Sequence, residues 1–337
     1  MAKKELEHLY EQIKKATELL QSNLHTGMID ALIEVGDDIH DRDVQQEDGL
    51  PDDATAKKLK AIIDEIDLTK FEPEEIRQVL QVEMVFAAEF DKLEPNQQIT
   101  PEAVATLTSF MILTITPNLE DPYQLADIAA GSGNLLYAVQ NQLEQEGGVN
   151  VHVYAVDNDE NMLGLASMSA ALTGADVDLY HQDAIDPLPF NDVNAVVADL
   201  PVGYYPIDER AKNFATAADK GHSYAHHLLM EQALRVLKPG GLGLFFVPSA
   251  VFKSEESKGL TEWIAKNAYF QGLLGMPEAF FSTPDAAKSL LVLQKPGADA
   301  KQAPQVLLAQ FPDVNDHAAF QKFVIDVRNW HRQNLED

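Results

Sequence analysis

Hydrophobic residues recur every three or four positions through the first hundred residues, which is the period of an α-helix with one buried face. One such stripe runs over Leu6–Leu20, a second over Leu59–Ile66, and a third follows Pro73 in EEIRQVLQVEMVFAAEF. These segments contain no glycine-rich loop and no cluster of residue types that carry catalysis. The pattern therefore predicts a small helical N-terminal domain over residues 1–97, with a role in packing or recognition.

From residue 98 onward, short apolar runs alternate with amphipathic segments. Thr100 and Pro101 predict a helix start, with Thr100 as N-cap and Pro101 at the first helical position, and this helix runs to about Ile115. The runs YQLADIAA, VNVHVYAVD, ADVDLYHQD, VNAVVADL, GLGLFFVPS, KSLLVLQK and QVLLAQF predict strands. Such alternation is typical of a mostly parallel sheet with helices on both faces. Residues 98–337 are therefore predicted to form a Rossmann-like α/β domain that binds its ligand at the carboxyl ends of the strands.

The segment DIAAGSGNLL, residues 127–136, has the form of a strand, a tight glycine turn and a helix start. Turns of this kind present backbone N–H groups to a nucleotide. Gly131 and Gly133 form the turn, and the helix is predicted to begin near Asn134. A dinucleotide fingerprint requires a third glycine where the chain has Leu136, and a P-loop requires a Gly-Lys-Ser/Thr sequence that is absent here. The loop therefore favours a nucleotide without phosphates.

Charge narrows the choice of ligand further. No Lys or Arg occurs between Lys92 and Arg210, so side-chain cations from this stretch do not hold the ligand. S-Adenosyl-L-methionine contains adenosine but no phosphate, and its positive sulfonium suits an acidic pocket. Acids recur at successive predicted strand ends: Asp127 near the methionine, Asp157 for the ribose hydroxyls, and Asp183 for the adenine amino group.

Composition excludes several other classes of function. The 337 residues include no cysteine, which removes disulfides, thiolate metal sites and cysteine nucleophiles. His222 and His226 would share a helix face, but no third ligand is evident, so no metal site is predicted. The apolar runs are too short for a membrane span and no signal-peptide core is present, so we expect a cytoplasmic protein without a membrane partner. With 54 acidic and 25 basic residues, a net charge of −29, tight duplex DNA binding is not expected.

The fourth predicted strand ends in the tetrapeptide Asp199-Leu200-Pro201-Val202. In the order Thr100-Pro101, glycine loop, Asp157, Asp183 and tetrapeptide, the chain resembles class I S-adenosylmethionine-dependent methyltransferases. The resemblance is to the N6-adenine DNA methylase type found in type I restriction-modification subunits, whose tetrapeptide is [N/D]-P-P-[F/Y]. It covers residues 98–297, including FFSTPDAAKSLLVLQK, and is closest to the YtxK-like group of stand-alone bacterial proteins.

The resemblance implies a methyltransferase domain over residues 98–337 that transfers a methyl group to an amino nitrogen, adenine N6 of DNA or RNA. The Asp199 side chain and the Leu200 carbonyl would accept hydrogen bonds from the target amino group, with Pro201 beside them. The cofactor would be S-adenosylmethionine, and its implied contacts are Thr100, Asp127, Ala129, Gly131, Gly133, Asn134, Asp157, Asn158, Asp183, Ala184 and Asp199.

Two departures from the family tetrapeptide leave alternatives open. Leu200 replaces a proline, and Val202 replaces the aromatic ring on which a flipped base stacks, a contact worth roughly 1–3 kcal/mol per base. Tyr204 or Tyr205 is a candidate for supplying a ring from a shifted position. The alternatives are a protein amide or a small molecule as methyl acceptor, and a non-catalytic module that binds S-adenosylmethionine. The helical N-terminal domain is a candidate surface for a protein partner.

Overall fold

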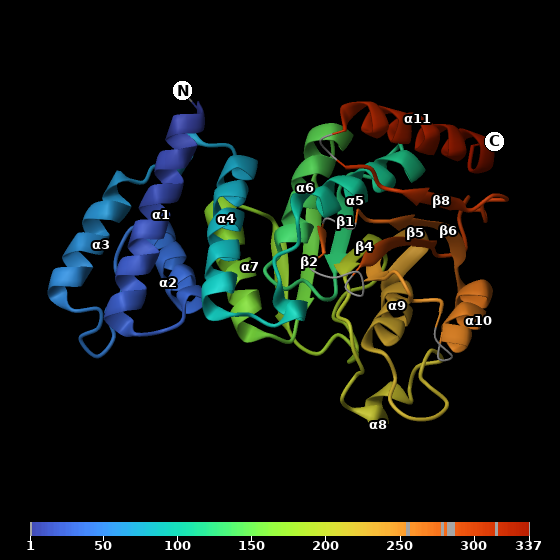
Figure 1. Ribbon diagram of the computed structural model, residues 1–337, viewed down its shortest axis with the longest axis horizontal. Coiled ribbons are helices and arrows are strands. Elements are labelled where there is room, and N and C mark those ends of the chain that lie inside the picture. The colour runs from blue at the N-terminus through green and yellow to red at the C-terminus, as the bar shows by residue number, and fades with distance from the viewer. Residues whose placement is uncertain (1, 254–256, 278–279, 282–286, 314–315, 337) are drawn as a thin grey trace.

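The computed structural model describes residues 2–253, 257–277, 280–281, 287–313 and 316–336, and Figure 1 shows a helical cluster beside a sheet with helices. The helical cluster contains α1 (Ala2–Leu24), α2 (Met28–Asp41), α3 (Asp53–Glu65) and α4 (Pro73–Asp91). One short 3₁₀ turn, Leu68–Lys70, lies between α3 and α4, and another, Pro95–Gln97, follows α4. The three predicted apolar stripes lie in α1, α3 and α4, whereas α2 was not predicted. The boundary at residues 97 and 98 stays a prediction.

The helical cluster is packed directly against the sheet domain through α7 (Glu160–Thr173). Gly36 of α2 faces α7 so closely that a Cβ there would lie 2.0 Å from Met168 Cγ, and a Cβ at Gly164 of α7 would lie 2.9 Å from Ile33. Each glycine thus admits a side chain of the opposite helix. The apolar core of the cluster consequently extends from Leu20 and Ile63 into Leu165 of α7.

Glu83 of α4 lies inside this apolar core. Its side chain has no solvent exposure, and neither carboxylate oxygen has a hydrogen-bond partner among the described residues. Burial raises the pKa of Glu83 to about 7, although the charge of Lys14 opposes the shift. The folded protein therefore keeps this carboxyl protonated at pH values where the unfolded chain ionises it.

Replacing Glu83 with glutamine is expected to change how stability depends on pH. Because the folded pKa is raised, wild-type stability falls as pH rises from the unfolded pKa of about 4.5 through 7. The unfolding free energy of Glu83→Gln relative to wild type should therefore increase by about 2–3 kcal/mol between pH 5 and pH 8. Urea unfolding followed by circular dichroism measures it. Glu89→Gln, an exposed change on the same helix, should give a profile parallel to wild type; a parallel profile for Glu83→Gln would contradict the prediction.

The sheet domain is built on one eight-stranded sheet, in the order β3-β2-β1-β4-β5-β7-β6-β8. Strands β1 to β5 are parallel, β7 runs antiparallel to β5 and β6, and β8 is parallel to β6. The strands are β1 (Tyr123–Asp127), β2 (Val151–Asp157), β3 (Val177–His181), β4 (Val193–Asp199), β5 (Leu237–Pro248), β6 (Tyr269–Gly275), β7 (Lys288–Gln294) and β8 (Leu307–Gln310). The predicted mostly parallel α/β fold is confirmed.

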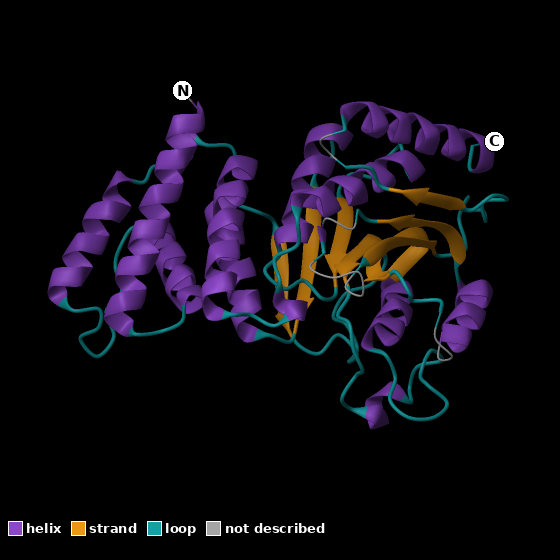
Figure 2. Cartoon of the chain, in the orientation of Figure 1, coloured by secondary structure: helices purple, strands orange, loops and turns teal. Residues whose placement is uncertain are grey.

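Helices cover both faces of the sheet (Figures 1 and 2). They are α5 (Glu102–Ile115), α6 (Asn134–Gly147), α7, α9 (Ala225–Val236), α10 (Ser257–Asn267) and α11 (His317–Asn334). The short helix α8 (Asp208–Ala211) lies away from the sheet, at the bottom of the view in Figure 1. Residues of α5, α6 and α11 share one apolar core with the sheet, and residues of α9 and α10 share another. No helix in the described part of the chain combines the length and apolarity that crossing a membrane requires.

Several local predictions were wrong. Thr100 is not an N-cap: Pro101 takes that position with an extended backbone, no side chain caps α5, and the Thr100 carbonyl accepts hydrogen bonds from other segments. His222 precedes α9, which begins at Ala225, so His222 and His226 do not share a helix face. Strand β3 ends at His181, two residues before Asp183. Strand β6 was not predicted.

Candidate active site

Two adjoining cavities lie at the carboxyl ends of β1, β2 and β4, where ligands bind in open α/β sheets. The larger cavity has a volume of about 640 Å³ and the smaller one about 420 Å³. Ala129, Gly131, Met162 and Asp199 line both cavities. The two are therefore halves of one hollow, divided around the glycine loop and the tetrapeptide.

Most residues predicted for the site lie on the walls of this hollow. The larger cavity is lined by Thr100, Ala129, Gly131, Asp199, Leu200 and Pro201, and the smaller by Ala129, Gly131, Asp157, Asn158, Asp183, Ala184, Asp199, Pro201 and Tyr204. Asp127, Gly133 and Asn134 are not among the lining residues. The side chains of Asp127 and Asn134 are buried behind the walls.

The glycine loop depends on backbone conformations that favour glycine. Gly131 has a φ of +51° and Gly133 a φ of +73°. A Cβ at Gly133 would also lie 2.5 Å from the Tyr137 ring, so a side chain there would collide with α6. The Gly131 N–H donates to a carboxylate oxygen of Asp157 at 2.7 Å. The end of β2 thus holds the loop in place from the neighbouring strand.

Carboxylates crowd this end of the sheet. Asp127 is 1% exposed, and one of its oxygens accepts a hydrogen bond from the Ala129 N–H at 2.9 Å. Burial raises the pKa of Asp127 well above its usual range, and the charges of Asp157 and Asp199 raise it further. Burial also raises the pKa of Asp157, against the opposing effect of its backbone hydrogen bonds. A positive group placed beside Asp127 and Asp157 would relieve this repulsion.

Asp183, predicted to accept from an adenine amino group, is bound by the protein's own donors. One of its oxygens accepts from the Tyr205 hydroxyl at 2.6 Å and from the Arg210 guanidinium at 3.2 Å. The other accepts from the Ile185 N–H at 3.0 Å. Tyr205 is consequently buried against Asp183, whereas Tyr204 is 54% exposed and stacks on Tyr224 with ring centroids 4.6 Å apart.

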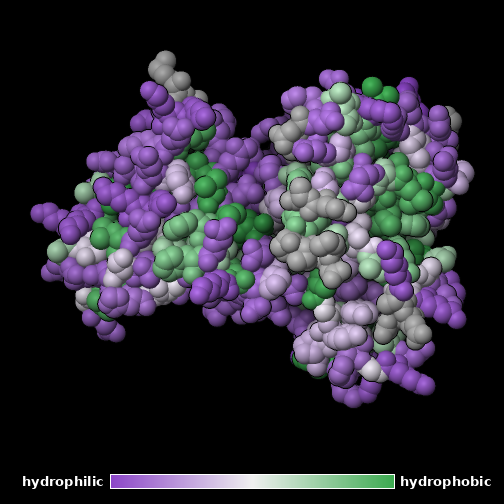
Figure 3. All heavy atoms as spheres, viewed as in Figure 1, coloured by the Kyte–Doolittle hydropathy of each residue, from purple (hydrophilic) through white to green (hydrophobic). Residues whose placement is uncertain are grey.

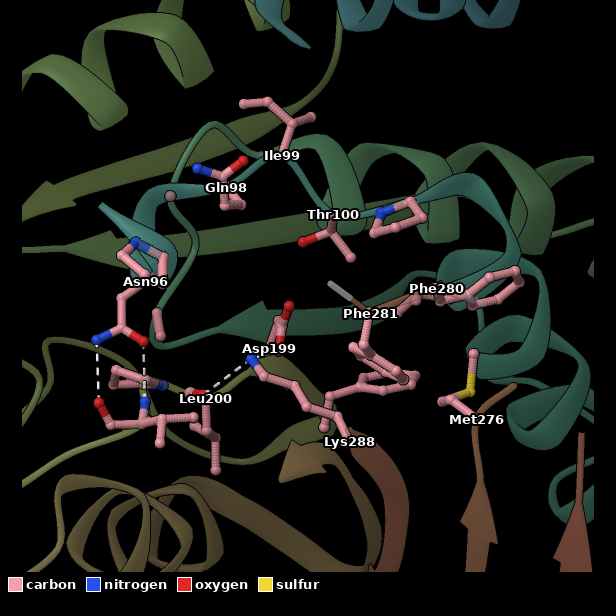
Figure 4. A pocket seen from close by; sticks show the side chains of 18 of the residues that line it. Asn96, Gln98, Ile99, Thr100, Asp199, Leu200, Met276, Phe280, Phe281 and Lys288 are labelled. Carbon is pink, nitrogen blue, oxygen red and sulfur yellow. Dashed lines mark hydrogen bonds and ion pairs between the residues drawn. The ribbon is translucent and has the colours of Figure 1, made fainter. Parts of the chain in front are cut away.

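The tetrapeptide at the end of β4 is held from several sides (Figure 4). Leu200 is fully buried, and its N–H donates to the Phe246 carbonyl at 3.1 Å. The Pro201 carbonyl is hydrogen-bonded to the ring of His226, which is 4% exposed. Burial lowers the pKa of His226 to about 3, so this ring is neutral at physiological pH. The tetrapeptide backbone is therefore fixed before any ligand enters.

A lysine from a distant strand lies at the predicted acceptor oxygens. Lys288, the first residue of β7, forms an ion pair with Asp199 through its ammonium group. The same Nζ lies 3.4 Å from the Leu200 carbonyl oxygen. Figure 4 shows Lys288 reaching toward these two residues, with Phe280 and Phe281 farther along the same cavity. Two oxygens of the tetrapeptide thus converge on one amino nitrogen.

Two residues that line the hollow, Asn96 and Lys288, were not predicted from the sequence. Neither was Arg77 of α4, which donates to Asn134 at the start of α6. Asn96 pairs with the backbone of Val202, donating to its carbonyl at 3.1 Å and accepting from its N–H at 3.0 Å. For Lys288, the available signal was a lone basic residue at the start of a predicted strand. No group of three or more His, Asp or Glu side chains suited to a metal occurs in the described residues.

The sheet order, with a glycine loop after β1 and an acid at the end of β2, defines the class of protein: a class I S-adenosylmethionine-dependent methyltransferase. Residues 85–323 match the family described as N-6 DNA methylase, and residues 7–85 match the YtxK N-terminal helical domain. The chain therefore belongs to the N-6 DNA methylase family.

Individual relatives agree with this assignment. The uncharacterized protein YtxK of Bacillus subtilis (strain 168) is 32% identical over 333 residues, 99% of each chain. A protein of Listeria monocytogenes, provisionally described as a class I S-adenosylmethionine-dependent methyltransferase, has a solved structure with a TM-score of 0.89 at 33% identity, covering 96% of this chain and 98% of that one. The type I restriction-modification system methyltransferase subunit of Streptococcus thermophilus shares the fold, with a TM-score of 0.68 at 14% identity over 94% of this chain and 74% of its own.

Proposed function

We propose that this protein binds S-adenosylmethionine across the two cavities and transfers its methyl group to an amino nitrogen, adenine N6 of a nucleic acid. The acids at this edge of the sheet suit a cationic cofactor, because Asp127 is buried, Asp157 is half-buried, and no cation is bound to either carboxylate among the described residues. When bound, the cofactor supplies a methyl group on a positively charged sulfur. Asp157 would accept from the ribose hydroxyls, since it lines the smaller cavity and the Gly131 and Asp159 N–H groups hold its two oxygens in place.

One observation carries the choice of acceptor: the Lys288 Nζ lies between the Asp199 carboxylate and the Leu200 carbonyl. An amino nitrogen is therefore the kind of group that these two oxygens bind together. A target amino group would replace the lysine, donate its two N–H groups to the same oxygens and leave its lone pair free for the methyl. The nitrogen–methyl bond would form as the sulfur–methyl bond breaks, and the nitrogen would then release one of its protons to water. Lys288 has to move aside for this exchange.

The larger cavity suits a planar acceptor. Val202 leaves the family's aromatic position without a ring, but Phe246, Phe280 and Phe281 line the same cavity. Aromatic faces of this kind stack on a base that has been turned out of a helix. Phe280 and Phe281 would thus take over the stacking that the tetrapeptide has lost, since Phe246 is only 2% exposed.

The distribution of acidic and basic residues along the chain affects where a nucleic acid could approach the protein. Residues 1–209 contain 41 acidic and 11 basic residues, whereas residues 210–337 contain 13 acidic and 14 basic ones. The acid excess therefore belongs to the first part of the chain, and hydrophilic side chains dominate the visible face of the helical cluster (Figure 3). An acceptor approaching over the later strands meets a nearly neutral segment. The net charge of −29 still favours a protein amide as the second candidate acceptor.

Tritiated methyl transfer into a cell lysate, separated into DNA, RNA, protein and small-molecule fractions, tests the proposal. We expect label in a nucleic-acid fraction that is lost when wild type is replaced by Asp199→Ala. Label in protein alone would favour the second candidate. Binding of S-adenosylmethionine by calorimetry without label in any fraction would overturn methyl transfer and leave a non-catalytic module.

A further inference from the structure

Side chains from before residue 98 contact three of the segments around the hollow. Arg77 of α4 reaches the start of α6 behind the glycine loop, Asn96 reaches the tetrapeptide at Val202, and Gln97 donates to Asp159 after β2. These are three separate loops of the sheet domain. The helical segment therefore does more than lie beside the sheet.

Arg77 makes the most buried of these contacts. Its side chain is 1% exposed, and its guanidinium donates to Glu74 on its own helix and to Glu102 of α5, the latter at 2.6 Å. The remaining Nη1 donates to the Asn134 amide oxygen at 2.7 Å. A buried arginine is stable only when its donors are matched in this way, so its position is tightly determined.

Asn134 transmits this position to the cavity. It is the first residue of α6, directly after Gly133, and its amide nitrogen donates to the Thr100 carbonyl at 2.7 Å. Arg77 therefore decides which way the Asn134 amide faces, since a guanidinium binds only the amide oxygen. Thr100 lines the larger cavity, and Gly133 ends the loop whose Gly131 lines both.

We propose that Arg77 is a positioning residue for the cofactor site, through which the N-terminal helical segment sets the affinity for S-adenosylmethionine. The inference rests on the proposed cofactor site. With Arg77 in place, the Asn134 amide joins the glycine loop to Thr100 and brings both walls of the hollow to their binding positions. The helical segment is in this sense part of the methyltransferase site. A change in the position of α4 would alter the affinity for the cofactor through the Arg77 side chain.

The test compares Arg77→Lys with Arg42→Lys in the full-length chain. Arg42 is an arginine of the same helical cluster, but it donates to backbone carbonyls of Ile63 and Ile66 and does not line either cavity. Calorimetry at 15 °C, where circular dichroism shows each variant folded, gives the Kd for S-adenosylmethionine. We expect Arg77→Lys to weaken binding about tenfold, because lysine loses the planar fork, and Arg42→Lys to leave it within twofold of wild type.

Asn134→Ala and the double variant extend the test to the proposed route. If Arg77 acts through Asn134, the double variant should bind S-adenosylmethionine no more weakly than Asn134→Ala alone. A lower melting temperature with unchanged Kd for Arg77→Lys would overturn the proposal, as would independent, multiplying effects in the double variant. Should Arg77→Lys not fold, Asn134→Ala with wild-type affinity would overturn it equally. Wild type that does not bind S-adenosylmethionine would instead contradict the proposed function.

Discussion

Asp199→Ala is expected to lower methyl transfer at least about 100-fold while S-adenosylmethionine binds within about threefold of wild type. The Asp199 carboxylate and the Leu200 carbonyl both contact the Lys288 Nζ, so the carboxylate is one of two oxygens that orient an amino nitrogen there. Alanine removes a charge-assisted hydrogen bond and the orientation it imposes, effects that together reach about 3 kcal/mol. Initial rates of tritium incorporation into the labelled lysate fraction, with calorimetry alongside, separate the two effects.

Asp199→Asn is the matched control for this prediction. Asparagine keeps a side-chain oxygen at the same place, and the family tetrapeptide accepts either residue at its first position. We expect Asp199→Asn to retain transfer within about tenfold of wild type, because the hydrogen-bond acceptor remains and only the charge is lost. Equal loss in the two variants would assign the effect to the ion pair with Lys288. Unchanged turnover in Asp199→Ala would remove Asp199 from the mechanism.

The fold was predictable because periodicity reports which side chains are buried. Alternating helices and strands indicated a parallel sheet covered on both faces, and the structure has that sheet. Strand β6 was not predicted because its sequence, YFQGLLG, contains a glycine that interrupts the pattern of a strand. The strand pairing is irregular at this point, between Phe270 and Gly272. A Cβ at Gly272 would lie 3.2 Å from Leu307 of β8, so close strand approach explains that glycine. Contacts of this kind depend on the neighbouring strand and leave no local pattern.

Of the candidate site, the sequence could predict only what lies along the ends of adjacent parallel strands. Asp127 and Asp157 end β1 and β2, and the geometry of a parallel sheet brings such ends together. Arg77 and Lys288 were not predicted, because their partners Asn134 and Asp199 are 57 and 89 residues away in the sequence. The sequence between Lys92 and Arg210 contains no Lys or Arg, but this does not tell which cations from other segments lie next to it in the fold. From outside that stretch, the structure brings Lys288 into the larger cavity and Arg77 behind the glycine loop.

Asp157→Ala is expected to weaken S-adenosylmethionine binding at least about 100-fold. In the folded protein the Asp157 carboxylate accepts the Gly131 N–H at 2.7 Å and the Asp159 N–H at 2.9 Å, joining the glycine loop to the start of α7. Alanine removes these two bonds as well as the proposed ribose contacts, and hydrogen bonds to a charged group contribute about 1.5–3 kcal/mol each. Part of the loss therefore arises before the cofactor enters, as the loop loses its attachment to β2.

Asp176→Ala separates this effect from a general change in charge. Asp176 is 78% exposed at its side chain and pairs with His152, so removing it also takes one negative charge from the chain but alters only a surface ion pair. We expect Asp176→Ala to bind S-adenosylmethionine within about twofold of wild type by calorimetry. If Asp157→Ala bound as tightly as Asp176→Ala while both remained folded, the carboxylate would have no specific role. The pKa of Asp157 argues against that outcome. Burial raises this pKa, which means that the surroundings disfavour the charged carboxylate. A ligand that donates hydrogen bonds and brings positive charge would stabilise the charged form, so its binding should depend on Asp157.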